Sequence, residues 1–276
     1  MLLRRIMKTY YETDNGKLFC MDNVKYLKTV NDGAFDLTVT SPPYDNLRDY
    51  KGYSWDFEAL AKELYRTTKE GGVVVWIVGD ATINGSETGS SFKQALYFME
   101  CGFLLHDTMI YQKQNPLPIT ANRYNPCFEY MFIFSKGKPK TFNPIMELKQ
   151  WKETRKVKNY SKDKAGIKNY GKVNNSNEKL KCNIFSYKVG GGHVTKDKIA
   201  YEHPAIFPEK LAYDHIVSWS NENDLVFDPF MGSGTTAKMC EKSNRKWRGC
   251  EISKEYCKIT EERVENERTQ LKLSFT

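Results

Sequence analysis

The sequence predicts an α/β fold in which an open sheet carries helices on both faces. Short apolar runs rich in β-branched residues alternate with segments of helical spacing toward both ends of the 276-residue chain. This alternation is the βαβ pattern of a parallel sheet. Two polar loops, at residues 40–44 and 228–236, each follow such a run. Because open α/β sheets bind ligands beyond the carboxyl ends of their strands, we expect both loops to border one crevice.

The first half of the chain supplies a regular series of elements. Residues 35–40 predict a strand that ends before Pro42, since proline cannot continue a ladder. Residues 57–69 carry apolar side chains at helical spacing, and Gly71 and Gly72 end that helix. The unbroken apolar run at 73–78 predicts a strand buried on both faces. The other elements expected here are a helix at 91–101 and strands at 103–111 and 130–135.

Positive charge is concentrated in the segment that follows. The whole chain has a net charge of +8, whereas residues 136–198 hold 17 Lys plus Arg against 5 Asp plus Glu. Aromatic residues scattered among these charges argue against simple disorder. We therefore interpret residues 136–200 as an inserted module. Its charge is typical of a surface that contacts a phosphate backbone, and a solvated lysine-rich loop is the alternative.

The α/β pattern resumes after this segment and contains a glycine loop. The expected elements are helices at 208–219, 235–243 and 253–269 and strands at 225–228 and 247–251. Gly232 and Gly234 let the backbone approach a ligand, and the helix that begins at Thr235 directs its N–H groups to the same place. Glu251 ends the next strand, where a carboxylate can accept both hydroxyls of a ribose. These features together describe a nucleoside-cofactor site, with a capped tight turn as the alternative. A P-loop is excluded because no Lys-Ser/Thr follows the glycines.

The earlier loop, Thr40-Ser-Pro-Pro-Tyr44, is suited to hold an amino group on a planar base. Two prolines fix two φ angles and remove two N–H donors, which leaves a rigid rim of carbonyl oxygens and the Ser41 hydroxyl. Acceptors at the hydrogens of an exocyclic amine favour the geometry needed for attack and stabilise the developing positive charge. Tyr44 adds a flat face for stacking. An ordinary proline-rich turn is the alternative.

Taken together, the motifs resemble those of the β group of DNA amino-methyltransferases, which use S-adenosylmethionine. Residues 40–44 resemble the catalytic motif of that family, and residues 228–236 its methionine-binding motif. Residues 203–211 are similar to the segment that closes over the cofactor, and residues 18–22 to the strand whose acid meets the adenine. In the β group the target-recognition segment lies between the two main motifs, where this chain has its basic insertion.

The resemblance implies a Rossmann-like S-adenosylmethionine-dependent methyltransferase sheet with helices on both faces and an inserted target-recognition module. It divides the chain into a catalytic-motif half at 1–135, a basic target-recognition region at 136–200 and a cofactor-binding half at 201–276. By the same resemblance, Ser41, Pro42 and Pro43 bind the target amino group and Tyr44 stacks on the base. The residues implied to contact the cofactor are Asp22, His203, Ala205, Phe207, Asp228, Phe230, Gly232, Gly234, Thr235, Thr236 and Glu251. The residues expected to contact DNA are Arg48, Lys113, Lys152, Arg155, Lys156 and Lys158.

The implied reaction is methyl transfer to the exocyclic amine of a base flipped out of duplex DNA. Serine at position 41 resembles the enzymes that methylate cytosine at N4, whereas adenine-N6 enzymes more often carry aspartate. Cytosine is therefore the favoured target, and adenine N6 is the alternative. A nucleotide-cofactor oxidoreductase would also use a glycine loop and Glu251, but it leaves Ser41–Tyr44 and the basic insertion unexplained. A DNA-binding protein without activity is a further alternative.

The cysteines and the apolar runs of the sequence predict where in the cell the protein acts. The seven cysteines form no C-x-x-C pair, so we expect reduced thiols and no metal site. No apolar run is long enough for a membrane span, and the basic start is not followed by a signal-peptide core. These observations predict a cytoplasmic protein whose partner is double-stranded DNA. A restriction-modification system with a cognate restriction endonuclease is left open, as are a monomer and a homodimer.

Overall fold

The computed structural model describes residues 8–43, 55–119, 122–149, 159–163, 166–170 and 177–274. The chain divides into two compact units, one formed by Met1–Asn143 with Asn183–Thr276 and the other by Pro144–Cys182. The predicted insertion at 136–200 is thus split, because its first eight and last eighteen residues belong to the larger unit. Its role in target recognition stays a prediction.

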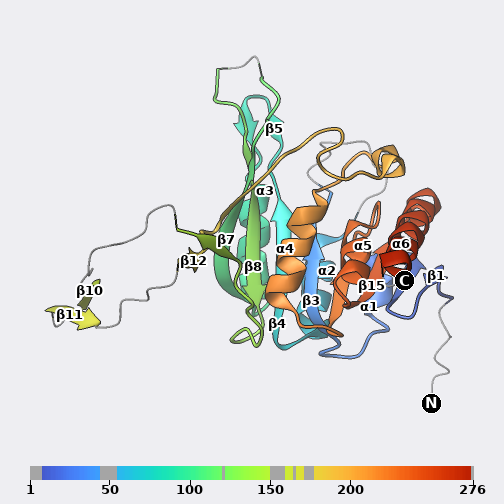
Figure 1. Ribbon diagram of the computed structural model, residues 1–276, viewed down its shortest axis with the longest axis horizontal. Coiled ribbons are helices and arrows are strands. Elements are labelled where there is room, and N and C mark those ends of the chain that lie inside the picture. The colour runs from blue at the N-terminus through green and yellow to red at the C-terminus, as the bar shows by residue number, and fades with distance from the viewer. Residues whose placement is uncertain are drawn as a thin grey trace. The chain divides into compact units, whose positions relative to one another are not determined.

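The larger unit is organised around a mixed sheet, which among the described residues has nine strands (Figure 1). In spatial order they are β1 (Tyr11–Glu12), β2 (Gly16–Cys20), β15 (Lys246–Glu251), β14 (Leu225–Asp228), β3 (Phe35–Thr40), β4 (Thr68–Val78), β8 (Phe128–Ser135), β7 (Leu104–Lys113) and β13 (Ile184–Tyr187). The neighbours from β2 to β4 are all parallel. Their carboxyl ends therefore lie along one edge of the sheet.

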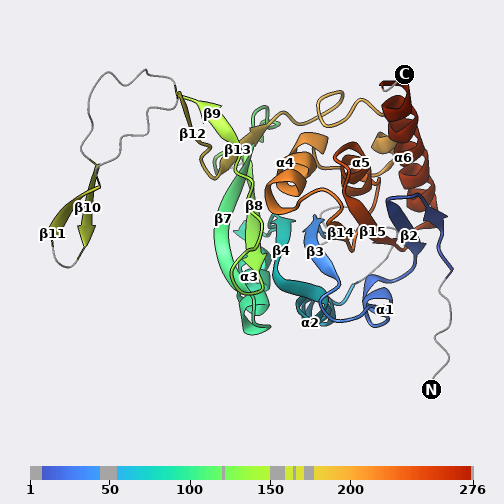
Figure 2. The same cartoon turned by 60° about the horizontal axis from the view of Figure 1, so that its bottom comes forward.

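Helices cover both faces of this sheet (Figure 2). One face carries α1 (Asn23–Leu27), α2 (Phe57–Thr67) and α3 (Ser90–Glu100), and the other carries α4 (Glu209–Trp219), α5 (Thr235–Lys242) and α6 (Lys254–Ser274). A short 3₁₀ helix, η1 (Lys198–Glu202), precedes α4. Because both faces are covered, the apolar run Val73–Val78 is fully buried, as its sequence predicts. The predicted helices and strands are present, with shifts of a few residues at their ends.

The prediction of a parallel sheet is wrong for β8, which is antiparallel to both β4 and β7. The described residues between β7 and β8 form no helix, and strands joined in this way can run in opposite directions. The helix expected at 57–69 also ends early, since β4 begins directly at Thr68. Gly71 and Gly72 then lie inside the strand, where the pairing with β3 shifts register between Phe35 and Leu37.

The smaller sheets are antiparallel pairs of strands. In the second unit, β9 (Met146–Leu148) pairs with β12 (Glu178–Leu180), and β10 (Asn159–Asp163) pairs with β11 (Gly166–Tyr170). In the larger unit, β5 (Thr82–Ile83) pairs with β6 (Ser86–Glu87). Within the described ranges, no helix combines the length and the apolar character that a membrane crossing needs.

Candidate active site

The two polar loops meet in one cavity of about 680 Å³. Ser41, Pro42 and Pro43 follow β3 and line it, as does the stretch Pro229–Ser233 that follows β14. Glu251 at the end of β15 and Asp22 just after β2 complete the same edge. The walls of this cavity are thus formed by residues at the carboxyl ends of four neighbouring parallel strands. Volumes of this size are typical of cofactor and small-ligand sites.

The glycine loop has a backbone that only glycine adopts without strain. Gly232 has φ +52° and Gly234 has φ +80°, both in the left-handed region. A Cβ atom at Gly232 would lie 2.9 Å from Nε2 of His203, and one at Gly234 would lie 2.9 Å from the Cα atom of Thr260. Gly234 is the N-cap of α5, so the loop leads directly into a helix amino terminus beside the cavity.

Glu251 ties this loop to the end of β15. Its Oε2 accepts the Gly232 N–H at 2.8 Å, and its Oε1 accepts the Ser253 N–H at 2.8 Å. Burial raises the pKa of Glu251, against the lowering effect of its backbone donors. A carboxylate oxygen can accept more than one hydrogen bond, and Glu251 lines the cavity. The arrangement suits a ligand that presents two hydroxyl donors.

The stretch His203–Phe207 forms another wall of the cavity. Nδ1 of His203 accepts the N–H of Ala205 at 3.1 Å, and the ring packs edge-on against Tyr256 with centroids 4.4 Å apart. Because Nδ1 accepts, a neutral His203 carries its proton on Nε2, toward Gly232. This wall and the glycine loop therefore lie in direct contact.

Three of the residues expected at the cofactor do not line the cavity: Asp228, Gly234 and Thr236. Asp228 is fully buried, and its Oδ1 accepts the Thr40 hydroxyl at 2.7 Å and the Phe230 N–H at 3.0 Å. Thr236 donates its hydroxyl to the Val39 carbonyl at 3.3 Å. These contacts join the ends of β14 and β3. The side chains of Asp228 and Thr236 therefore hold together the two loops that follow these strands.

The burial of Asp228 leads to a testable pH dependence. Desolvation raises its pKa from 3.8 to about 6, although hydrogen bonds from Thr40 and Phe230 work to lower it. A raised folded-state pKa gives stability that is present in full below the unfolded pKa and is lost as pH rises through about 6. The unfolding free energy of the natural protein, relative to Asp228→Asn, should fall by about 2 kcal/mol between pH 4.5 and pH 7.5. Urea titrations at both pH values measure this difference, and a constant difference contradicts the assignment.

The cavity is also lined by residues that the sequence analysis missed. Lys113, which is expected to contact DNA, lines the cavity and pairs with Glu129 at 2.7 Å. Glu129, Trp55 and Tyr256 also line the cavity but were not expected to do so. Trp55 packs its ring edge-on against Phe230 with centroids 5.0 Å apart. Some of the predicted site residues lie outside the described ones, namely Tyr44, Arg48, Lys152, Arg155, Lys156 and Lys158.

A glycine loop, a helix start and a strand-end carboxylate around one cavity, at the carboxyl ends of parallel strands, define a nucleoside-cofactor-binding α/β protein. The model of the N6/N4 methyltransferase family, described as DNA methylase, matches residues 35–262. The chain therefore belongs to this family, which confirms the expected DNA amino-methyltransferase family and its Rossmann-like sheet. Membership of this family argues against the alternative of a nucleotide-cofactor oxidoreductase.

Individual relatives agree with this assignment. The chain is 58% identical over 243 residues to the orphan methyltransferase M.BamHII of Bacillus amyloliquefaciens, covering 87% of this chain and 92% of that protein. It is 28% identical to the type II methyltransferase M.HpaI of Haemophilus parainfluenzae, covering 91% of this chain and 74% of that one.

Solved structures share the fold. The PvuII DNA methyltransferase, titled cytosine-N4-specific, aligns with TM-score 0.69 and 19% identity over 96% of this chain and 95% of its own. A DNA modification methylase of Thermus thermophilus in complex with S-adenosyl-L-methionine aligns with TM-score 0.61 and 20% identity, over 91% of this chain and 93% of its own.

Proposed function

We propose that this DNA methyltransferase transfers a methyl group from S-adenosylmethionine to N4 of a cytosine flipped out of double-stranded DNA. The observation that carries the proposal is the single cavity shared by Ser41–Pro43 and the loop Pro229–Ser233. One loop suits an amino group and the other suits a nucleoside cofactor, and methyl transfer requires both at once.

The residues around the glycine loop fit the cofactor. Glu251 would accept the ribose hydroxyls, Asp22 would meet the adenine side, and the backbone at Gly232 allows close approach of the methionine part. His203, Ala205 and Phe207 would form the wall beside the loop. When bound, S-adenosylmethionine supplies an electrophilic methyl group on its sulfonium sulfur.

The proline loop would orient the acceptor. The Ser41 hydroxyl and the carbonyl oxygens of this rigid segment would accept hydrogen bonds from the two N–H groups of the exocyclic amine. These hydrogen bonds would turn the lone pair of the nitrogen toward the methyl group. The same acceptors would stabilise the positive charge that develops on the nitrogen. A strong general base is unnecessary if the proton leaves after the methyl group has arrived. Tyr44 would stack on the flipped base.

The choice of cytosine rests on Ser41, and the PvuII enzyme with its similar fold is titled cytosine-N4-specific. Adenine N6 is the alternative. The test incubates the chain with mixed-sequence DNA and methyl-labelled S-adenosylmethionine and then separates the digested nucleosides. We expect the label in N4-methylcytosine. Label in N6-methyladenine would replace cytosine by the alternative, and no label would favour a binding protein without activity.

Double-stranded DNA is expected to bind through the basic region at 136–200, with Arg48 and Lys113 nearer the base. Each neutralised phosphate adds about 0.9 to the slope of log affinity against log salt. Replacing Lys152, Arg155 and Lys156 together by alanine should therefore lower DNA affinity and reduce that slope by about 2–3, without changing cofactor affinity. Fluorescence anisotropy at several salt concentrations measures both. The matched control replaces three exposed lysines outside this region, Lys28, Lys242 and Lys246, and equal slopes in the two variants would contradict the role of the insertion.

We also propose that the enzyme acts without a paired restriction endonuclease. The support is M.BamHII, which at 58% identity is named an orphan methyltransferase.

A further inference from the structure

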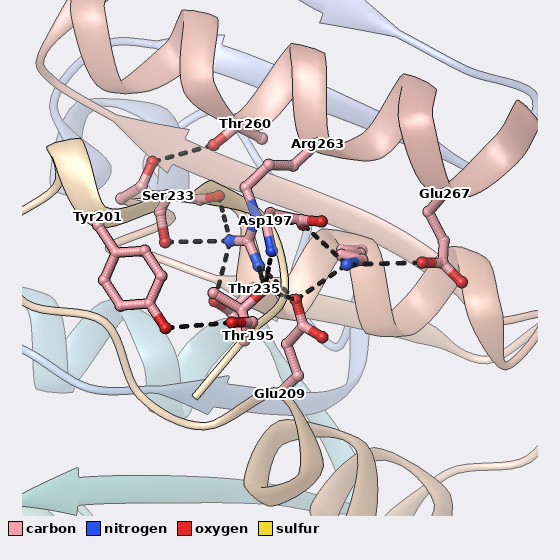
Figure 3. Close-up of polar contacts among 11 residues, drawn as sticks. Thr195, Asp197, Tyr201, Glu209, Ser233, Thr235, Thr260, Arg263 and Glu267 are labelled. Carbon is pink, nitrogen blue, oxygen red and sulfur yellow. Dashed lines mark hydrogen bonds and ion pairs between the residues drawn. The ribbon is translucent and has the colours of Figure 1, made fainter. Parts of the chain in front are cut away.

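A largely buried cluster of charged side chains connects α5, α6 and the segment 195–209 (Figure 3). Arg263 of α6 and Lys238 of α5 face the carboxylates of Asp197, Glu209 and Glu267. The Arg263 side chain is fully buried, and the side chains of Lys238 and Glu267 are each only 8% exposed. Buried ions of this kind are retained only where close partners of opposite charge surround them. The contacts of these ions therefore show which parts of the chain they hold together.

One side of the Arg263 guanidinium bonds the glycine loop. Its Nη1 donates to the Ser233 carbonyl at 2.6 Å, to the Ser233 hydroxyl at 3.1 Å and to the Thr235 hydroxyl at 3.2 Å. One turn earlier on α6, Thr260 donates its hydroxyl to the Gly232 carbonyl at 2.9 Å. Arg263 and Thr260, which do not line the cavity, therefore fix the loop, while Ser233 and Thr235 also line the cavity itself.

The rest of the guanidinium bonds the segment Thr195–Glu209, here called the covering segment. Nε donates to Oδ2 of Asp197 at 2.9 Å, and Nη2 donates to Oε1 of Glu209 at 2.6 Å. These two carboxylates lie on either side of His203–Phe207, the stretch that lines the cavity. Lys238 reinforces both ends, since its ammonium donates to Asp197 at 2.7 Å and to Glu209 at 2.9 Å.

The carboxylate of Asp197 stays ionised although it is largely buried. Desolvation works to raise the pKa of Asp197, but hydrogen bonds from Lys238 and Arg263 outweigh it and hold that pKa below its ordinary value. The planar guanidinium holds its N–H donors in a fixed geometry, so it can donate to the glycine loop and to two carboxylates at once. A lysine at the same position would keep the charge but could not reach the loop and both carboxylates together.

We propose that Arg263 is a positioning residue that holds the glycine loop and the covering segment in register before S-adenosylmethionine binds. This inference rests on the proposed cofactor site. If the two walls are loosened, only a fraction of molecules has the binding-competent arrangement, and the apparent dissociation constant rises by the inverse of that fraction. Once the cofactor is bound, the walls are held by the ligand and the chemical step proceeds as before.

The primary variant is Arg263→Lys. We expect its dissociation constants for S-adenosylmethionine and S-adenosylhomocysteine, measured by calorimetry, to rise about tenfold. The kcat at saturating cofactor and the KM for DNA should stay within about twofold of the natural protein. In the cofactor-free protein, amide hydrogens of residues 195–209 should exchange faster than in the natural protein, and this readout does not depend on activity.

The matched control is Arg268→Lys, the same substitution about one and a half turns further along α6. Arg268 pairs at 3.2 Å with Asp14, whose side chain is 96% exposed, and it does not contact the loop. This control should bind cofactor and exchange amides like the natural protein. A milder second variant, Asp197→Asn, weakens only the connection to the covering segment and should raise the cofactor dissociation constant by a smaller factor.

The outcomes separate the two proposals. Failure of the natural protein to bind S-adenosylmethionine overturns the proposed function. If the natural protein binds it, unchanged affinity and unchanged amide exchange in Arg263→Lys overturn the positioning role, as does a fall in kcat with unchanged affinity. If Arg263→Lys does not fold, Asp197→Asn decides, because unchanged cofactor affinity in that variant also overturns the inference.

Discussion

Replacement of Glu251 by glutamine should weaken the binding of S-adenosylmethionine roughly 100-fold. Both carboxylate oxygens accept backbone N–H groups, from Gly232 and Ser253. A glutamine offers only one acceptor oxygen, so its NH₂ group would face one of these N–H donors without a hydrogen bond. The variant would disturb the glycine loop and also lose an acceptor for the ribose hydroxyls. Calorimetric titration with the cofactor measures the loss.

Glu241→Gln is the matched control for this prediction. Glu241 is also buried, and it accepts hydrogen bonds from Thr13, Asn15 and Trp247 rather than from the cavity walls. Its replacement should lower the melting temperature and leave cofactor affinity near that of the natural protein. If Glu251→Gln binds the cofactor normally, or if both variants lose affinity equally, the assignment of Glu251 to the ribose is wrong.

The second large effect is expected at Ser41. Replacing it by alanine removes one acceptor for the target amine, and loss of a group that stabilises developing charge slows reactions about 100-fold or more. The proposed cofactor contacts lie on the other loop, so cofactor affinity should change little. Single-turnover methyl transfer measures the rate, and calorimetry measures the affinity. Equal losses of rate and cofactor affinity would contradict the assignment of Ser41 to the amine.

Much of this site could be predicted from local sequence because strand ends control its layout. The loops after residues 40 and 228 each follow a buried strand, and parallel neighbouring strands bring their carboxyl ends to one edge. This is why Ser41 and Gly232 line the same cavity despite their separation in sequence. Glu251 could be placed for the same reason, since β15 is the next strand along the sheet.

Other features depend on contacts that sequence patterns do not contain. The apolar run at 130–135 looks the same in a parallel and an antiparallel strand, so the direction of β8 could not be predicted. Asp228 looks like a ligand contact, but the Thr40 hydroxyl on the neighbouring strand end binds its carboxylate. Arg263 lies in a highly charged helix that suggests a solvated surface, and its burial arises only when Asp197 and Glu209 pack against it.

A crystal structure of the chain with S-adenosylhomocysteine tests the central claim most directly. We expect the ribose hydroxyls on the Glu251 carboxylate, the methionine part along Gly232 and Ser233, and the sulfur facing Ser41–Pro43 across a gap that admits a cytosine ring. A product molecule bound away from this cavity, or one whose sulfur faces away from Ser41, would contradict the account.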